Sequence, residues 1–174
     1  MIQRSHPQFS LCGLNCALCP RYNTAGLSRC LGCGAENFSE FHPTCAIMTC
    51  NNKKESVAFC FECSNYPCAR YPDEDTKDSF ISYQNRKKDM ISAQQNLNTY
   101  LNKINEKNLI LNYLLEYHND GRSKSFYCQA VNLLELEDLN EIKIRLFQTS
   151  DAKEVRQMIL ETAQKRGINL ALRK

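Results

Sequence analysis

The sequence predicts a mainly α-helical protein with a small N-terminal cysteine-rich module and a C-terminal helical bundle. Two observations lead to this prediction. Ten of the eleven cysteines fall between Cys12 and Cys68. After residue 79, apolar residues recur at steps of three and four, which is the period of an amphipathic helix. We therefore expect two domains, the module over residues 1–72 and the helical domain over residues 73–174.

The spacing of the first cysteines predicts a metal site. Cys16 and Cys19 form one CxxC pair, and Cys30 and Cys33 form a second pair ten residues further on. A CxxC turn presents two sulfurs to one ion, and two such turns complete a tetrahedral zinc site with Zn–S distances of about 2.3 Å. Gly34 follows directly, where a positive φ is expected.

The remaining cysteines predict a second zinc site with a less certain ligand set. Cys60 and Cys63 form its CxxC pair, and two further ligands are expected from Cys45, Cys50 and Cys68. About two Zn²⁺ per chain are therefore expected. The spacing leaves open which cysteines share an ion, including an arrangement in which alternate pairs do so. The role of Cys12 also stays open. His42 stands three residues before Cys45 and is interpreted as a loop residue, although imidazole can bind zinc.

Two other kinds of cysteine chemistry are weaker alternatives. Cys12, Cys16 and Cys19 have the spacing with which radical S-adenosylmethionine enzymes hold an iron–sulfur cluster, but the strand–helix alternation of their barrel is not visible here. An ordinary iron–sulfur cluster remains the alternative to zinc, since four thiolates suit both. A thiol-redox enzyme would place a CxxC pair in a βαβ pattern, which these pairs lack. A non-catalytic binding or adaptor module is therefore favoured over an enzyme.

The cysteine-rich segment also resembles a known family. The runs CGLNCALCP, CLGCG and FCFECSNYPCARY are similar to an uncharacterised prokaryotic cysteine-rich domain-of-unknown-function family, whose members begin CGLxCxxCP and end FCxxCxxxPC. The similarity covers about residues 11–72, and all ten cysteines fall on the pattern. The resemblance implies a metal-binding, zinc-type module and suggests ligand roles for Cys12 and Cys45. It implies no reaction.

The C-terminal half predicts several helices with apolar stripes that pack into a core. A helical pattern runs from residue 79 to 117, with an expected break near Asn105. Later helices are expected over residues 125–136, 136–147 and 151–165, and Gly167 is expected to end the last one. Cys128 lies in the first of these later helices and is expected to be a half-buried, inert thiol.

Arg122 and Lys124 are candidates for binding an anion. They lie beside the expected N-terminus of the helix that begins near Ser123 or Ser125, where free N–H groups and the helix dipole favour a phosphate or carboxylate. A solvated basic turn is the simpler interpretation of the same residues.

Charge and hydropathy narrow the expected partners. Residues 1–75 contain six basic and seven acidic residues, and thiolate-bound zinc would add negative charge, so binding of the module to nucleic acid is not expected. Basic and aromatic residues are rarely interleaved in the helical half, which also argues against nucleic acid. An unidentified protein partner is compatible with the sequence.

The sequence contains no apolar run of about 18 residues, so no membrane span is expected. No signal peptide is visible at the start, so a reducing, cytoplasmic location is expected.

Overall fold

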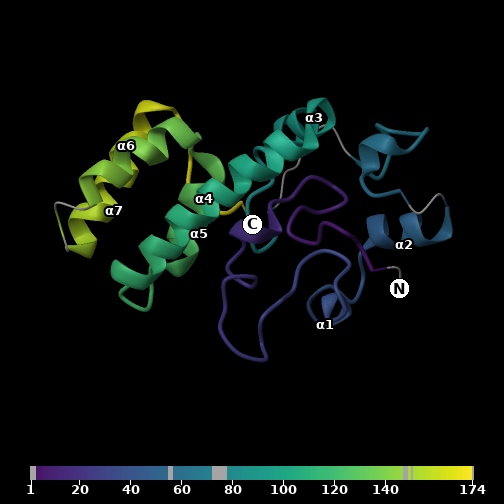
Figure 1. The fold of residues 1–174 in the computed structure, drawn as a ribbon, viewed down its shortest axis with the longest axis horizontal. Coiled ribbons are helices and arrows are strands. Elements are labelled where there is room, and N and C mark those ends of the chain that lie inside the picture. The colour runs from purple at the N-terminus through teal and green to yellow at the C-terminus, as the bar shows by residue number, and fades with distance from the viewer. Residues whose placement is uncertain (1–2, 55–56, 72–77, 147–148, 150, 174) are drawn as a thin grey trace.

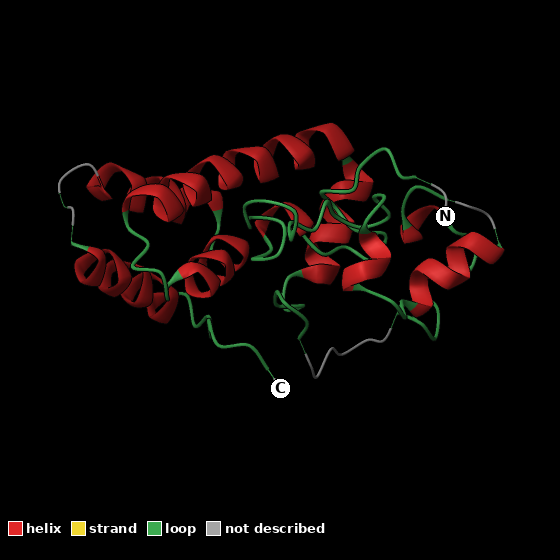
Figure 2. Cartoon of the chain, turned by 90° about the horizontal axis from the view of Figure 1, so that it is seen from below, coloured by secondary structure: helices red, strands yellow, loops and turns green. Residues whose placement is uncertain are grey.

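The computed structural model describes residues 3–54, 57–71, 78–146, 149 and 151–173. These residues form helices joined by turns and loops, without a strand among them (Figure 2). The mainly α-helical fold is therefore confirmed. In the described part of the module, turns and short helices stand where short hairpins were expected. The expected domain boundary after residue 72 lies outside the described residues.

The N-terminal module contains two single 3-10 turns and two short α-helices. These are η1 (Cys16–Leu18), α1 (Phe38–Phe41), α2 (Ala46–Lys53) and η2 (Cys60–Glu62). The C-terminal half contains α3 (Arg86–Gln95), α4 (Leu97–Tyr117), α5 (Lys124–Leu133), α6 (Leu136–Leu146) and α7 (Ala152–Lys165). Figure 1 shows α4–α7 gathered at one end of the molecule and α2 at the other, with the purple N-terminal part of the module and α3 in the middle.

The helical pattern of residues 79–117 breaks at Asn96, and the expected break near Asn105 is wrong. Asn96 ends α3 and caps α4, because its side-chain oxygen accepts a 3.0 Å hydrogen bond from the backbone N–H of Thr99. An asparagine inside a helix is tolerated when its side chain points to solvent and does not compete for backbone hydrogen bonds. Asn105 is exposed on α4 and therefore does not end the helix. The apolar pattern of the 21-residue α4 therefore continues without interruption.

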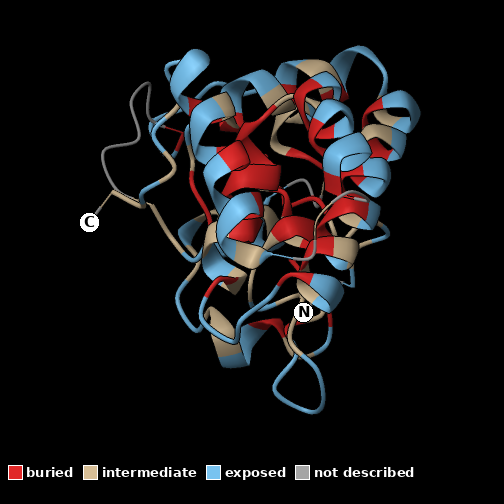
Figure 3. Ribbon diagram, turned by 90° about the vertical axis from the view of Figure 1, so that its left-hand side faces the viewer, coloured by how far each residue is buried: buried red, intermediate tan, exposed pale blue. Residues whose placement is uncertain are grey.

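Helix α5 lies at the centre of the helical half. All seven of its residues from Tyr127 to Leu133 are buried, so this helix is covered on every side. Cys128 is fully buried there, which corrects the expected half-burial. The inward face of α4 packs against α5 through residues such as Ile104, Leu111 and Leu114. Figure 3 shows this buried layer running through the middle of the molecule.

The same hydrophobic core continues into the cysteine-rich module. Phe9 contacts Phe59 within the module, with ring centroids 5.4 Å apart, and Tyr100 of α4, with ring centroids 4.9 Å apart. Asn15 is buried beside these rings and accepts a 2.8 Å hydrogen bond from the Tyr100 hydroxyl. Its amide nitrogen donates to Asp89 of α3 and Asn132 of α5. The module and the helices are therefore joined by both apolar and polar contacts.

The C-terminal segment returns to the start of the helical half. Gly167 follows α7 with a φ of 66°, as its expected position after the helix requires. Further on, Arg173 forms hydrogen bonds with the fully buried carboxylate of Asp78, the shortest of them 2.7 Å. None of the described helices is both long enough and apolar enough to cross a lipid bilayer.

Candidate metal centre

Two CxxC segments of the module adopt the same local structure. In each, a 3-10 turn starts at the first cysteine, and the backbone N–H of the second cysteine donates to its carbonyl oxygen. The N···O distances are 3.0 Å from Cys19 to Cys16 and 3.1 Å from Cys63 to Cys60. The second cysteine of each pair is extended, with φ and ψ of −77° and 141° at Cys19 and −75° and 134° at Cys63. Each turn thereby presents two sulfurs at a fixed spacing.

The third CxxC segment is held differently. The backbone N–H of Cys33 donates a 2.8 Å hydrogen bond to the carbonyl oxygen of Pro7. Gly32 has a φ of 102°, and a Cβ at this position would lie 2.2 Å from that same oxygen. Gly34 has the positive φ that was expected, 75°. Glycine is therefore required at residue 32 for the segment from Cys30 to Cys33 to lie against Pro7.

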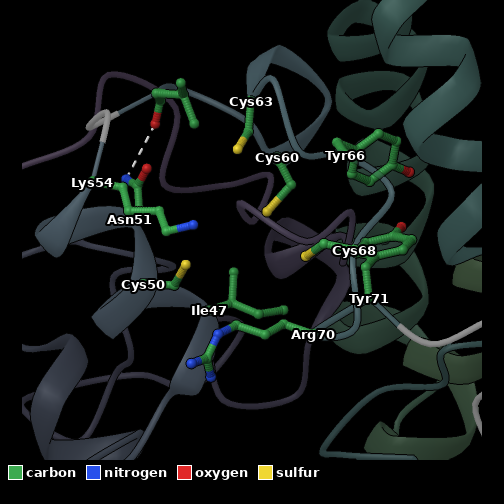
Figure 4. A pocket seen from close by; sticks show the side chains of 11 residues that line it. Ile47, Cys50, Asn51, Lys54, Cys60, Cys63, Tyr66, Cys68, Arg70 and Tyr71 are labelled. Atoms are coloured by element: carbon green, nitrogen blue, oxygen red, sulfur yellow. Dashed lines mark hydrogen bonds between the residues drawn. The ribbon is translucent and has the colours of Figure 1, made fainter.

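Four cysteines from three separate segments line one small cavity. Cys50 comes from α2, Cys60 and Cys63 come from η2 and its C-terminal end, and Cys68 comes from the loop that follows. The cavity has a volume of about 50 Å³ and is otherwise walled mainly by apolar and aromatic side chains, including Ile47, Val57, Tyr66 and Tyr71. Figure 4 shows the four sulfur-bearing side chains extending into the same space.

The other cysteines of the module form a row beside this cavity. Cys33 is buried in a small apolar cluster with Leu11, Phe38 and Met48, and Cys16 and Cys45 pack against that cluster. Burial raises the pKa of Cys33 to about 11, and the neighbouring Cys12 and Cys45 thiols contribute to the increase. Burial also raises the pKa of Cys16 well above its usual value, with further contributions from Cys33, Cys19 and Cys12.

Cys19 and Cys30 lie at the other end of this row. Burial raises the pKa of Cys19, and Cys30 contributes to the increase. Burial raises the pKa of Cys128 in α5 to about 12, and Cys19 contributes to the increase. The four cysteines of the predicted first site thus influence one another electrostatically, Cys16 with Cys33 and Cys19, and Cys19 with Cys30. Cys12 acts on both Cys33 and Cys60, so it links this row to the cavity. The influence of Cys19 on Cys128 has no signal in the sequence.

The cysteines face common spaces without closing around an ion. Among the residues that the structure describes, no three His, Cys, Asp or Glu side chains are placed to hold a metal ion. All eleven cysteines are free thiols. The donor chemistry of Cys50, Cys60, Cys63 and Cys68 nevertheless fits zinc, because four thiolates complete its tetrahedral coordination. Binding would require these side chains to turn further inward and to release their protons.

Arg4 organises the module, although nothing in the sequence singles it out. Its guanidinium donates hydrogen bonds to the carbonyl oxygens of Phe9, Cys33 and Ala58, at 2.9, 3.2 and 2.7 Å. It also lies over the ring of Phe59, 5.1 Å from the centroid. One cation therefore ties together three segments that carry or adjoin cysteines.

The other predicted site residues have internal partners. His42 stacks on Phe38 with ring centroids 4.9 Å apart and meets the edge of Phe80 at 5.9 Å. Lys124 donates a 2.7 Å hydrogen bond to Thr24, and the backbone N–H of Arg122 donates to the carboxylate of Asp120. A negative charge of the protein itself therefore already lies at the N-terminus of α5. The anion site at Arg122 and Lys124 stays a prediction.

Comparison with known families agrees with the cysteine pattern. Residues 8–73 match the family described as "Protein of unknown function (DUF3795)". The chain carries a DUF3795 domain. This domain includes all ten clustered cysteines, both 3-10 turns and the cavity lined by Cys50, Cys60, Cys63 and Cys68. No curated protein and no solved structure matches the chain. The family assigns neither a reaction nor a ligand to the DUF3795 domain.

Proposed function

We propose that the DUF3795 domain of this chain binds about two Zn²⁺ as structural ions and that the protein acts as a non-catalytic binding or adaptor module. The observation that carries this proposal is the convergence of Cys50, Cys60, Cys63 and Cys68 on one cavity. The second ion is assigned to the row of six cysteines beside the cavity, in which Cys16 and Cys33 are central.

The surroundings of the cavity support a structural role for the ion. Tyr66 and Tyr71 pack edge to face with centroids 5.0 Å apart, and together they form one wall. An apolar wall shields thiolates from water and favours a closed coordination sphere without an open position for substrate. A structural zinc ion contributes on the order of 10 kcal/mol to folding in small zinc-dependent modules. Such an ion would join α2, η2 and the loop at Cys68.

The cysteine pattern supports a reducing location. CxxC pairs recur three times between Cys12 and Cys68. Neighbouring cysteines persist as thiols, or as metal ligands, mainly in reducing compartments. A cytoplasmic protein with an unidentified protein partner is therefore part of the proposal.

The proposal is tested first by elemental analysis and absorption spectroscopy of protein purified without oxygen. About two zinc ions per chain and no visible absorption band are expected. Iron with sulfide and a visible charge-transfer band would overturn the zinc assignment and favour an electron-transfer or redox centre.

Single substitutions then test the ligand set. Cys50→Ser, Cys60→Ser, Cys63→Ser and Cys68→Ser should each remove about one zinc ion per chain, because each removes one of four thiolates. Cys128→Ala should leave the zinc content unchanged and serves as the matched control, since Cys128 lies outside the domain. Replacement of zinc by cobalt would report tetrahedral thiolate coordination by its ligand-field bands. Full zinc content after Cys60→Ser would contradict the assignment of this cavity.

A further inference from the structure

A second cavity lies on a different side of the module and has different chemistry. Its volume is about 450 Å³, which is within the range of small-molecule sites. One wall is the loop of residues 22–25 together with Arg29, and the other wall is one face of α4. The α4 wall consists of Asn108, Asn112, Leu115 and Glu116. The first three are spaced by four and three residues and so share a face, and Glu116 adjoins Leu115.

The loop that forms the first wall is fixed in place. The Asn23 side chain donates hydrogen bonds to the carbonyl oxygens of Ala17 and Cys19, at 2.7 and 3.0 Å. The Thr24 hydroxyl donates to Pro20 at 2.8 Å and accepts from Lys124 of α5. Both walls are therefore held by the fold, which reduces the entropy that a ligand would lose on binding.

The cavity contains one side chain of each charge. The Arg29 guanidinium lies over the ring of Tyr22, 4.8 Å from the centroid, and its Nε donates a 3.0 Å hydrogen bond to the Tyr22 carbonyl oxygen. These contacts orient the guanidinium at the cavity. Glu116 is the acidic residue of the lining. A ligand that carries both charges would meet a partner for each of them.

Asn108 provides an acceptor that the fold leaves unused. Its side-chain oxygen is buried and has no hydrogen-bond partner among the residues that the structure describes. A buried acceptor without a partner destabilises the fold, and a donor from a ligand would relieve this. Asn108 and Glu116 are eight residues apart, which is about 12 Å along the helix, so a ligand donor to Asn108 would have to be a separate group from one that pairs with Glu116.

From the opposed charges of Arg29 and Glu116 and the unpaired oxygen of Asn108, we infer that this cavity binds a small zwitterion of the α-amino acid class. The ligand's carboxylate pairs with Arg29, and its ammonium group pairs with Glu116. Tyr22 and Leu115 contact the remainder of the ligand. The inference is independent of the zinc proposal, because none of the lining residues is a cysteine.

The test is titration of the full-length, metal-loaded protein with each proteinogenic amino acid by calorimetry and ligand-observed NMR. At least one of them should bind with a dissociation constant below about 1 mM, since weaker binding would correspond to less than about 4 kcal/mol. No detectable binding of any of them at about 10 mM would overturn the inference.

Variants locate the site and assign the two charges. Arg29→Gln and Glu116→Gln should each weaken binding at least about tenfold. Arg145→Gln and Glu106→Gln remove exposed charges outside the cavity and should have no effect. The carboxamide of the bound amino acid should bind weakly and should be insensitive to Arg29→Gln, because it lacks the carboxylate. Binding that survives both Arg29→Gln and Glu116→Gln would place the ligand elsewhere and refute the assignment.

Discussion

The ammonium group of Lys107 donates a 2.6 Å hydrogen bond to the carbonyl oxygen of Leu134, which ends α5. It also donates to the carbonyl oxygen of Asn132 at 3.3 Å. Lys107 is buried on α4, so a cation here supplies donors to carbonyl groups at the end of α5, where the Asn85 side chain is a second donor to Asn132. Burial lowers the pKa of Lys107 to about 8.

Lys107→Met should therefore destabilise the fold by about 2 to 4 kcal/mol, because it removes the Lys107 donor from the Leu134 carbonyl and one of the two donors to the Asn132 carbonyl. Lys103→Met is the matched control, one turn earlier on α4. Lys103 pairs with Glu135 where both side chains are about one-third exposed, and such a pair contributes at most about 1 kcal/mol. Chemical unfolding of both variants measures the difference. Equal losses in the two variants would show that Lys107 does not cap α5.

Asp89 should make stability depend on pH in the acid range. Burial raises the pKa of Asp89 to about 6 from 3.8, despite the nearby Lys107. Between these values the folded state binds a proton that the unfolded state has released, so this contribution to stability is present below pH 4 and is lost as the pH rises through 6. Relative to Asp89→Asn, the wild type should lose about 2 to 3 kcal/mol between pH 4 and pH 7. Parallel stability curves for the two proteins would refute the raised pKa.

Asn15 should couple unfolding of the module to unfolding of the helices. Its side chain contacts Asp89, Tyr100 and Asn132, which belong to three different helices. Asn15→Ala should cost about 2 to 4 kcal/mol, because it removes three buried hydrogen bonds together. Asn52→Ala changes an exposed residue of α2 and should cost less than about 0.5 kcal/mol. Unfolding followed by near-UV and far-UV circular dichroism measures both effects. An unchanged midpoint for Asn15→Ala would contradict this role.

Gly32→Ala should disrupt the module more than the same change at Gly26. Both glycines have positive φ, 102° and 76°, but only the Cβ at residue 32 would collide with Pro7. Gly26 has open space around it, so Gly26→Ala should cost only the local backbone strain of about 1 to 2 kcal/mol. Gly32→Ala should lower the melting temperature further and reduce the zinc content. Equal melting temperatures would show that the contact with Pro7 is not needed.

Local sequence signals predicted the local structure of this chain well. The CxxC spacing predicted that Cys60 and Cys63 act as a pair, because neighbouring residues determine a 3-10 turn. The period of apolar residues predicted α4 to α7, because helix formation also depends on residues three and four apart. Gly34 and Gly167 have the expected positive φ.

Relationships between distant segments were not predictable from those signals. The position of Cys50 on the cavity depends on how α2 packs, and spacing alone allowed Cys45 as well. Arg4 donates to the carbonyl groups of Cys33 and Ala58, which are 29 and 54 residues away. Lys107 donates to carbonyl groups that are 25 and 27 residues away. Residue type carries no information about such partners. The choice between Asn96 and Asn105 as the helix break required the capping geometry.

The contact between Phe9 and Tyr100 has a consequence for the order of events during translation. Tyr100 is made 32 residues after Cys68, which takes about 2 to 6 seconds at about 5 to 20 residues per second. During that interval all ten clustered cysteines have been synthesised, while the aromatic residue that covers Phe9 has not. The clustered thiols of a nascent chain are then exposed to oxidation, and under the zinc proposal open to zinc, before the helical cover of Phe9 exists.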